Sequence, residues 1–193
     1  MIKSKKHTPI IAFIVLAIAV LYIYPKQRDE VLKKSLNDEF DYNLSLVKKV
    51  KIKHLPKDAI LTRWVNDSTT IKNIINEKNS YILIFRIPKR SCTSCIHREF
   101  DLLKNHQGIK AFLPIKVITD ITVFRDFLLF ANYSKDENIE IFNCNDKLTY
   151  LDNIGKPYYI LLNKSLRIQE IFITVKSEGK LSENFLDKIS ALS

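Results

Sequence analysis

A strand that leads into a pair of cysteines constrains the fold of this chain more than any other feature. Residues 81–86, Y-I-L-I-F-R, form an apolar run of the length typical of a buried strand. Cys92 and Cys95 follow after a basic turn. The residues after the second cysteine place apolar side chains at helical spacing: Ile96, Phe100 and Leu103. A strand, a C-x-x-C motif and a helix, in this order, form the arrangement that makes a dithiol redox-active.

The C-x-x-C spacing at the start of a helix gives the two cysteines different roles. Unpaired backbone N–H groups and the helix dipole stabilise an anion there, so Cys92 is the expected thiolate and nucleophile. The preceding cations Lys89 and Arg90 favour the same negative charge. Cys95 lies one helical turn further on, where it can attack the mixed disulfide that Cys92 forms. We therefore predict Cys92 as the catalytic nucleophile and Cys95 as the resolving thiol.

A zinc site and a structural disulfide are the alternative uses of a C-x-x-C motif. A structural zinc site needs two further ligands, but His97 is too close on the same helix, and Cys144 and His106 have no partner pair. A disulfide between Cys92 and Cys95 would close only a very small loop, which restricts the unfolded chain little. We therefore expect no metal and no cofactor.

The other polar residues near the motif have structural interpretations. Cys144 ends an apolar run, so we expect a small buried side chain rather than a third redox thiol. We expect His97 and His106 on the surface, and Glu99 and Asp101 as charges on the exposed side of the helix. No buried acidic residue is predicted from this pattern.

The N-terminal residues predict a membrane anchor. Residues 9–24 carry no charge and follow a start with three lysines. As a helix they would span about 24 Å, slightly less than the hydrocarbon core of a bilayer. No small-x-small cleavage site lies at the polar boundary, and Tyr22 and Tyr24 suit the far interface. We predict an uncleaved signal-anchor, with a cleaved signal peptide as the alternative.

Both alternatives export the rest of the chain. The positive-inside rule keeps the lysines in the cytoplasm, so we expect a single-pass protein of the bacterial cytoplasmic (inner) membrane, with its C-terminal domain in the periplasm or outside. We divide the chain into a signal-anchor (residues 1–25), a juxtamembrane stalk and extension (26–56) and an α/β domain (57–193). The net charge is +10, but the cations are scattered, which argues against nucleic acid as a partner.

The remaining periodicity predicts a mixed α/β domain. Asp67 would cap a helix over residues 70–77, and Leu148 to Ile154 is ambiguous with some helical character. The last two strands have the short connection of an antiparallel pair, whereas the central ones alternate with helices and should be parallel. The predicted strands are 60–65, 81–86, 114–118, 139–142, 158–162 and 166–175, and the predicted helices are 70–77, the cysteine helix, 123–133 and 181–192.

This order of elements, with its C-x-x-C motif, resembles the thioredoxin fold. Within that fold, the chain is similar to the membrane-anchored TlpA-like thiol–disulfide oxidoreductases over about residues 60–192. Besides the motif, the resemblance rests on Pro157, which follows a Gly-Lys pair and precedes the strand Y-Y-I-L-L. It implies a three-layer α/β/α architecture with a mixed sheet. It also implies a cis-proline at Pro157 that packs against the dithiol, and substrate contacts from Lys156, Pro157, Thr93 and Ser94.

The immediate neighbours of the dithiol depart from the family pattern. Ser91 stands where the family commonly has Trp, and Thr93 and Ser94 stand where Gly-Pro or Pro-Pro is common. Lys156 replaces the usual Thr or Val before the proline. These departures affect the substrate and the direction of the reaction more than the fold.

The resemblance implies disulfide exchange with exported proteins that carry cysteine thiols or disulfides. A reductase direction, supplied by a membrane electron donor, is the expectation. The alternative is a binding or scaffold module that keeps the fold without turnover. A peroxiredoxin would need Pro-x-x-x-Thr/Ser-x-x-Cys, and Pro88 does not fit that spacing. A copper carrier would need C-x-x-x-C, which is one residue longer.

Overall fold

The computed structural model describes residues 8–49, 55–64, 67–74, 80–122, 124–133, 136, 138–176 and 179–192. The chain divides into two compact units, residues 1–42 and 43–193. The second unit starts earlier than residue 57, where the sequence analysis places the start of the α/β domain. It therefore includes part of the predicted extension.

Helix α1 (Thr8–Lys49) covers most of the predicted anchor and stalk. Within the described residues, no helix is long and apolar enough to cross a membrane. The side chains of residues 8–25 lie outside those that the structure describes, so the signal-anchor stays a prediction. The last turns of α1 belong to the second unit, where Asn43 and Leu46 are buried. These turns therefore form part of the folded domain.

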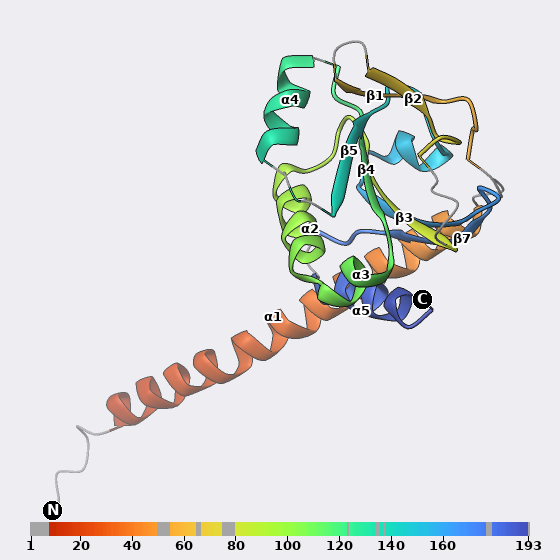
Figure 1. Cartoon of the computed structure of the whole chain (residues 1–193). Coiled ribbons are helices and arrows are strands. Elements are labelled where there is room, and N and C mark those ends of the chain that lie inside the picture. The colour runs from red at the N-terminus through yellow and green to blue at the C-terminus, as the bar shows by residue number, and fades with distance from the viewer. Residues whose placement is uncertain are drawn as a thin grey trace, which may run out of the picture. The chain divides into compact units, whose positions relative to one another are not determined.

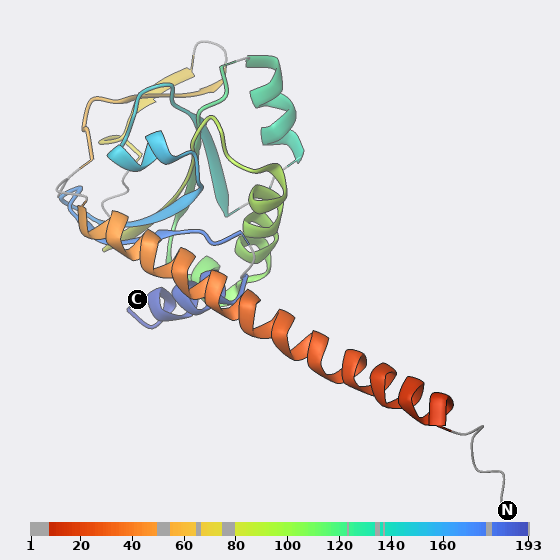
Figure 2. The same cartoon turned by 180° about the vertical axis from the view of Figure 1, so that it is seen from behind.

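The second unit is built on a seven-stranded mixed sheet with the strand order β2-β1-β5-β4-β3-β6-β7 (Figures 1 and 2). Strands β3, β4 and β5 are parallel to one another, and β6 pairs with β3 in antiparallel orientation. β6 and β7 form the predicted antiparallel pair. The strands are β1 (Ile60–Trp64), β2 (Asp67–Thr70), β3 (Tyr81–Ile87), β4 (Ile115–Thr119), β5 (Ile139–Asn143), β6 (Tyr158–Asn163) and β7 (Ile168–Ile173).

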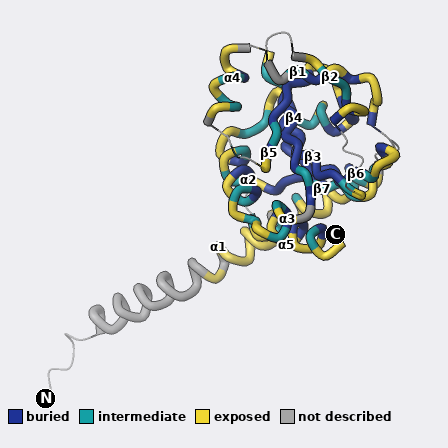
Figure 3. The backbone as a smooth tube through the Cα atoms, in the orientation of Figure 1, coloured by how far each residue is buried: buried dark blue, intermediate teal, exposed yellow. Residues whose placement is uncertain are grey.

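The centre of the sheet is buried on both faces, as Figure 3 shows for β3 and β4. Parallel strands covered on both sides have continuous apolar sequences, which explains the run from Ile82 to Phe85. Because side chains alternate along a strand, Ile82 and Ile84 join the core on one face, and Leu83 and Phe85 join the core on the other.

Different elements cover the two faces. One face packs against α2 (Thr93–Asn105), α3 (Gln107–Phe112), α4 (Phe124–Tyr133) and α5 (Gly179–Ser190). These helices contribute a set of buried apolar side chains: Phe100, Leu103, Ile109, Phe127, Phe185, Leu186 and Ile189. The opposite face packs against Leu46 of α1 and Leu151 of a 3-10 helix, η1 (Tyr150–Ile154). The sheet therefore lies between two layers, as the resemblance implied.

The predicted helix over residues 70–77 is wrong at its start. Asp67–Thr70 forms the edge strand β2, in which Thr69 pairs with Leu61 and Thr70 pairs with Ile60. β-Branched threonines suit a strand, and pairing with β1 prevails over the N-cap chemistry of Asp67. Residues 71–74 form turns, and residues 75–77 lie outside the described part of the chain.

A short helix, α3, follows α2 where the sequence suggested only a break. His106 separates the two helices, and its Nδ1 accepts a hydrogen bond from the Ile109 backbone N–H at 3.3 Å. Its Nε2 lies 3.0 Å from a carboxylate oxygen of Asp187 on α5. His106 is therefore a capping residue that joins three helices, and it is less exposed than predicted.

The most strongly bound buried charge is Arg86, near the end of β3. It is fully buried, and its Nε donates to Asp152 at 3.0 Å. The same guanidinium donates to the backbone carbonyls of Thr119, Cys144 and Asp146, at 2.9, 3.1 and 3.2 Å. The contacts connect β3 and the end of β4 to the segment between β5 and η1, so one side chain determines the path of this segment.

Removing this cation should destabilise the fold strongly. In Arg86→Met, the carboxylate of Asp152 loses its cation and the buried carbonyls of Thr119 and Cys144 lose a donor, so we expect a loss of about 3–5 kcal/mol in the free energy of unfolding. Urea unfolding of the reduced protein measures it. The matched control is Lys188→Met, which removes the exposed pair with Glu170 and should change stability by less than about 1 kcal/mol. Equal losses in the two variants would contradict this account.

Candidate active site

The two cysteines lie where β3 has ended and α2 begins. Cys92 is the N-cap residue of α2, with extended backbone angles, and it is partly exposed. Cys95 lies in the first turn and is only 5% exposed. Both are free thiols in this structure. The strand, motif and helix predicted from the sequence are therefore present in the predicted order.

The surroundings of Cys92 favour its thiolate. Its pKa is lowered from 9.0 to about 6, foremost by a hydrogen bond from the Cys95 side chain and next by the Ser94 hydroxyl. The Ser94 oxygen lies 3.0 Å from the Cys92 sulfur. The backbone N–H groups of Cys95 and Ser94 act in the same direction, as expected at the start of a helix. Ser94 thus contributes directly to the state of the dithiol.

Cys95 has the opposite tendency. Its pKa is raised from 9.0 to about 11, mainly because burial disfavours the charged form, and further by its interaction with Cys92. The positive charges of Arg98 and Lys176 act against this rise. One thiol of the pair is therefore exposed and readily ionised, while the other is buried and holds its proton.

The loop before β6 lies beside the turn that carries the motif. Gly155 adopts a left-handed conformation, with φ of 71°, and a Cβ placed on it would lie 3.1 Å from the Cβ of Arg90. Pro157 follows, and its carbonyl accepts hydrogen bonds from the backbone N–H and the hydroxyl of Thr174, both at 3.0 Å. The structure thus brings the sequence-predicted loop against the basic turn before Cys92.

The expected cis-proline is not present. No described peptide bond is cis, so the bond between Lys156 and Pro157 is trans. The sequence departs from the family pattern at the same place, because Lys156 stands where Thr or Val is common. The Lys156 ammonium donates to the side-chain oxygen of Asn43 at 3.3 Å. The proline is buried, and its carbonyl is already bonded to Thr174.

Glu99 is the functional-site feature that the sequence interpretation missed. It was expected on the exposed side of α2, but it is fully buried. Its carboxylate accepts hydrogen bonds from Arg98 at 2.6 Å, Tyr159 at 2.9 Å and Ser182 at 3.1 Å. The available signal was its spacing. Glu99 lies four residues after Cys95, which places both on the same face of the helix.

Arg98 extends this cluster toward the dithiol. Besides Glu99, it donates to the backbone carbonyls of Val175 and Lys176, at 2.8 and 2.5 Å. Helix α2 is thereby joined to the segment after β7, and Lys176 is held where its charge acts on the Cys95 thiol. The buried carboxylate and its arginine position the chain around the resolving cysteine.

The remaining predicted residues take up varied positions. Thr93, His97 and Asp101 are exposed on α2. Cys144 is 1% exposed at the end of β5, and burial raises its pKa. Arg86 binds its backbone carbonyl, and its side chain is buried as expected. In the described part of the chain, no three His, Cys, Asp or Glu residues gather as a metal site would require.

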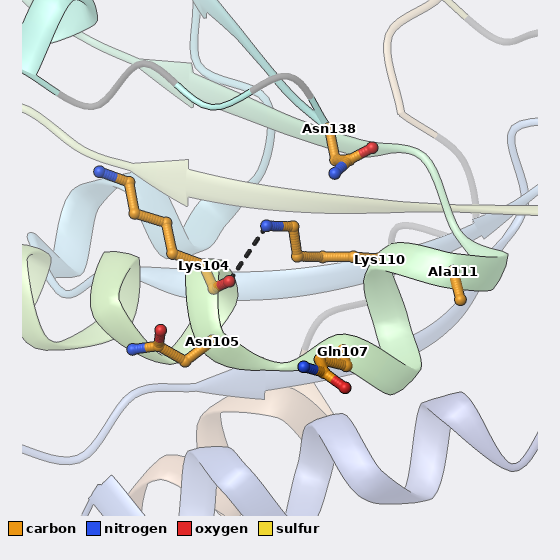
Figure 4. Close-up of a pocket in the computed structure, with 6 residues that line it drawn as sticks. All are labelled: Lys104, Asn105, Gln107, Lys110, Ala111 and Asn138. Atoms are coloured by element: carbon orange, nitrogen blue, oxygen red, sulfur yellow. Dashed lines mark hydrogen bonds between the residues drawn. The ribbon is translucent and has the colours of Figure 1, made fainter.

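An open pocket of about 390 Å³ lies elsewhere on the domain (Figure 4). Its walls include Lys104, Asn105 and Lys110, at the C-terminal end of α2 and on α3. Cys92 is at the other end of α2, roughly 18 Å away along a helix of this length. The pocket is therefore separate from the dithiol. Lys110 is already paired there with Asp136 at 2.8 Å.

The fold resembles that of several solved structures. A putative electron transfer protein from Aquifex aeolicus VF5 is 14% identical, with a TM-score of 0.51 over 69% of this chain and 90% of that one. A mutant of peroxiredoxin Q from Xanthomonas campestris is 14% identical, with a TM-score of 0.52 over 74% and 100%. Reduced Prx3 from Vibrio vulnificus, in complex with hydrogen peroxide, is 9% identical, with a TM-score of 0.52 over 70% and 92%.

The fold is thioredoxin-like. These neighbours and the mixed sheet support the mixed α/β, thioredoxin-like fold that the resemblance implied, whereas the transmembrane helix stays a prediction. No protein-family model matches the chain, and no curated protein matches it in sequence. At identities this low, the similarity shows the fold alone. The chemistry depends on the residues of the site itself.

The ionisation of Cys92 can be measured through its reaction with iodoacetamide. We expect the rate to rise with pH through a midpoint near 6, because only the thiolate reacts. In Cys95→Ala the foremost hydrogen bond to the thiolate is lost, and the midpoint should move upward, toward 9.0. Cys144→Ala is the control and should leave the midpoint unchanged. A wild-type midpoint near 9.0 would contradict the proposed stabilisation.

Proposed function

We propose that this protein is a thiol–disulfide oxidoreductase that uses Cys92 as the nucleophile and Cys95 as the resolving thiol. The observation that supports this proposal is the difference in accessibility and pKa between the two thiols. The exposed Cys92 has a pKa lowered to about 6, while the adjacent, buried Cys95 has a pKa raised to about 11. A nucleophilic cysteine has to be accessible and ionised, as Cys92 is. A resolving cysteine reacts only after the mixed disulfide has formed, so it can stay buried and protonated until then, as Cys95 does.

The reaction follows from these two thiols. The Cys92 thiolate attacks one sulfur of a substrate disulfide, and the other substrate sulfur leaves as a thiolate that takes up a proton. Cys95 then loses its proton and attacks the Cys92 sulfur, which releases the second substrate thiol. The dithiol loses two electrons and the substrate disulfide gains them. A further round requires a dithiol donor that reduces the Cys92–Cys95 disulfide.

We further propose that the domain is tethered to a membrane and acts on exported proteins, as the TlpA-like oxidoreductases are expected to do. The support is the uncharged run over residues 9–24 after a lysine-rich start. In an exported, oxidising compartment, a reductase needs electrons from a membrane donor. The loop with Lys156 and Pro157, beside the motif turn, is the proposed contact surface for substrate, together with Thr93 and Ser94.

A binding module without turnover is the second candidate. The observation that favours it is the trans bond before Pro157, together with the carbonyl of that proline, which is already bonded to Thr174. Such a module would hold a cysteine-containing partner without repeated exchange. A peroxidase is less well supported, because Lys89 stands three residues before Cys92, where the peroxiredoxin motif has a hydroxyl side chain.

Turnover with insulin as the disulfide substrate and dithiothreitol as the donor tests this proposal. We expect Cys92→Ala to lose all catalysed reduction, because no thiolate starts the exchange. Cys95→Ala should instead accumulate a mixed disulfide with a substrate, which non-reducing electrophoresis and mass spectrometry reveal. Cys144→Ala is the matched control and should retain the wild-type rate. Wild-type protein that never accelerates insulin reduction, yet still binds cysteine peptides, would favour the binding module.

A further inference from the structure

Three exposed cations lie on segments next to the dithiol, and they come from two separate parts of the chain. Lys89 and Arg90 lie in the turn before Cys92, and both are exposed. Lys176 lies just after β7, is exposed, and its charge acts on the Cys95 thiol. Lys156, in the loop before β6, is bonded to Asn43 and is not counted with them. We call this set the basic rim: Lys89, Arg90 and Lys176.

Specific contacts hold the segments of the basic rim together. Gly155, next to Lys156, packs so closely on Arg90 that an added Cβ would lie 3.1 Å from the Arg90 Cβ. The carbonyl of Pro157 is bonded to Thr174, two residues before Lys176. Arg98 donates to the Lys176 carbonyl at 2.5 Å. The turn before Cys92 and the segment after β7 are therefore joined near one end of α2, through the loop before β6 and through Arg98.

The acidic groups nearby do not offset this charge. Glu99 is fully buried and paired with Arg98, and Asp152 is paired with Arg86. Asp120 is the acidic residue that follows β4, and its backbone N–H donates to Ile87 at 3.1 Å, so it lies at the same edge of the sheet. It is half-buried, whereas Lys89, Arg90 and Lys176 are exposed. The exposed charges on the turn before Cys92 and on the segment after β7 are therefore positive.

We propose that the basic rim selects substrates whose cysteines lie in acidic peptide segments. The inference rests on the proposed oxidoreductase function and adds a substrate class to it. Carboxylates that flank the substrate disulfide would approach the rim and bring the substrate sulfur to Cys92. Electrostatic steering of this kind raises association rates by about 10- to 1,000-fold at low salt. It should be screened when the Debye length falls to about 3 Å, near 1 M salt.

Two synthetic peptides with one intramolecular disulfide each test this selection. Their sequences are the same except for the flanking residues, which are Glu in one peptide and Lys in the other. The full-length chain in a non-ionic detergent reduces each peptide, with dithiothreitol as the donor, at low salt and near about 1 M salt. We expect reduction of the Glu peptide to be at least about tenfold faster at low salt, with a ratio that approaches one at high salt.

A pair of matched variants tests whether the preference for the Glu peptide depends on the basic rim. Lys89→Gln/Arg90→Gln removes two cations of the rim, while glutamine keeps the Cβ that packs against Gly155. Lys164→Gln/Arg167→Gln removes one lysine and one arginine from the exposed turn between β6 and β7, at the opposite end of the sheet. We expect the first variant to lower the Glu-to-Lys peptide ratio at least about threefold, and the second to leave it unchanged. A change in Cys92 reactivity alone would alter both peptide rates equally and not their ratio.

The outcomes separate the two proposals. Equal rates for both peptides at low salt would overturn the acidic substrate class while leaving the oxidoreductase function in place. An equal loss of the ratio in both variants would also overturn it, because net charge and not the rim would be responsible. If wild-type protein reduces neither peptide nor insulin, the proposed function itself fails, and this inference fails with it.

Discussion

The buried guanidinium of Arg86 is the interaction on which the arrangement of the active-site edge depends. A charge removed from water is stable only when nearly every donor finds an acceptor, and Arg86 has the carboxylate of Asp152 and three backbone carbonyls. Those carbonyls belong to the last residue of β4 and to the chain after β5. Asp152 in turn accepts from the Tyr158 hydroxyl at 2.8 Å. One side chain thus connects the strand before the dithiol to the segment that leads into the Pro157 loop.

A second buried charge, Glu99, has the corresponding role on the opposite face of the sheet. Tyr158 and Tyr159 are neighbours in β6, so their side chains point to opposite faces. Tyr158 joins the Arg86 and Asp152 cluster, and Tyr159 donates to Glu99 at 2.9 Å. The same two residues pair with Arg86 and Phe85 of β3. The two polar clusters therefore stabilise the β3–β6 pair on both faces of the sheet. The turn that leads to the two cysteines follows directly after β3.

The sequence predicted the local features well because they depend on local chemistry. The strand over residues 81–86, the cysteine helix and the antiparallel pair β6–β7 all follow from periodicity and turn length. Asp67–Thr70 could not be assigned in this way, because its state depends on pairing with β1. The burial of Glu99 depends on Tyr159 and Ser182, which are 60 and 83 residues away in sequence. The trans bond at Pro157 likewise departs from what the resemblance implied.

The separation of the two cysteine pKa values determines how many protons accompany the electrons. Below a pH of about 6, reduction of a Cys92–Cys95 disulfide takes up two electrons and two protons. Between that pH and the pKa of Cys95, about 11, Cys92 stays ionised and only one proton is taken up. The potential of the couple therefore falls by about 30 mV per pH unit in this range, instead of about 59 mV. The hydrogen bonds at the start of α2 thus make the potential of this couple less sensitive to pH than that of a disulfide whose two thiols both hold their protons.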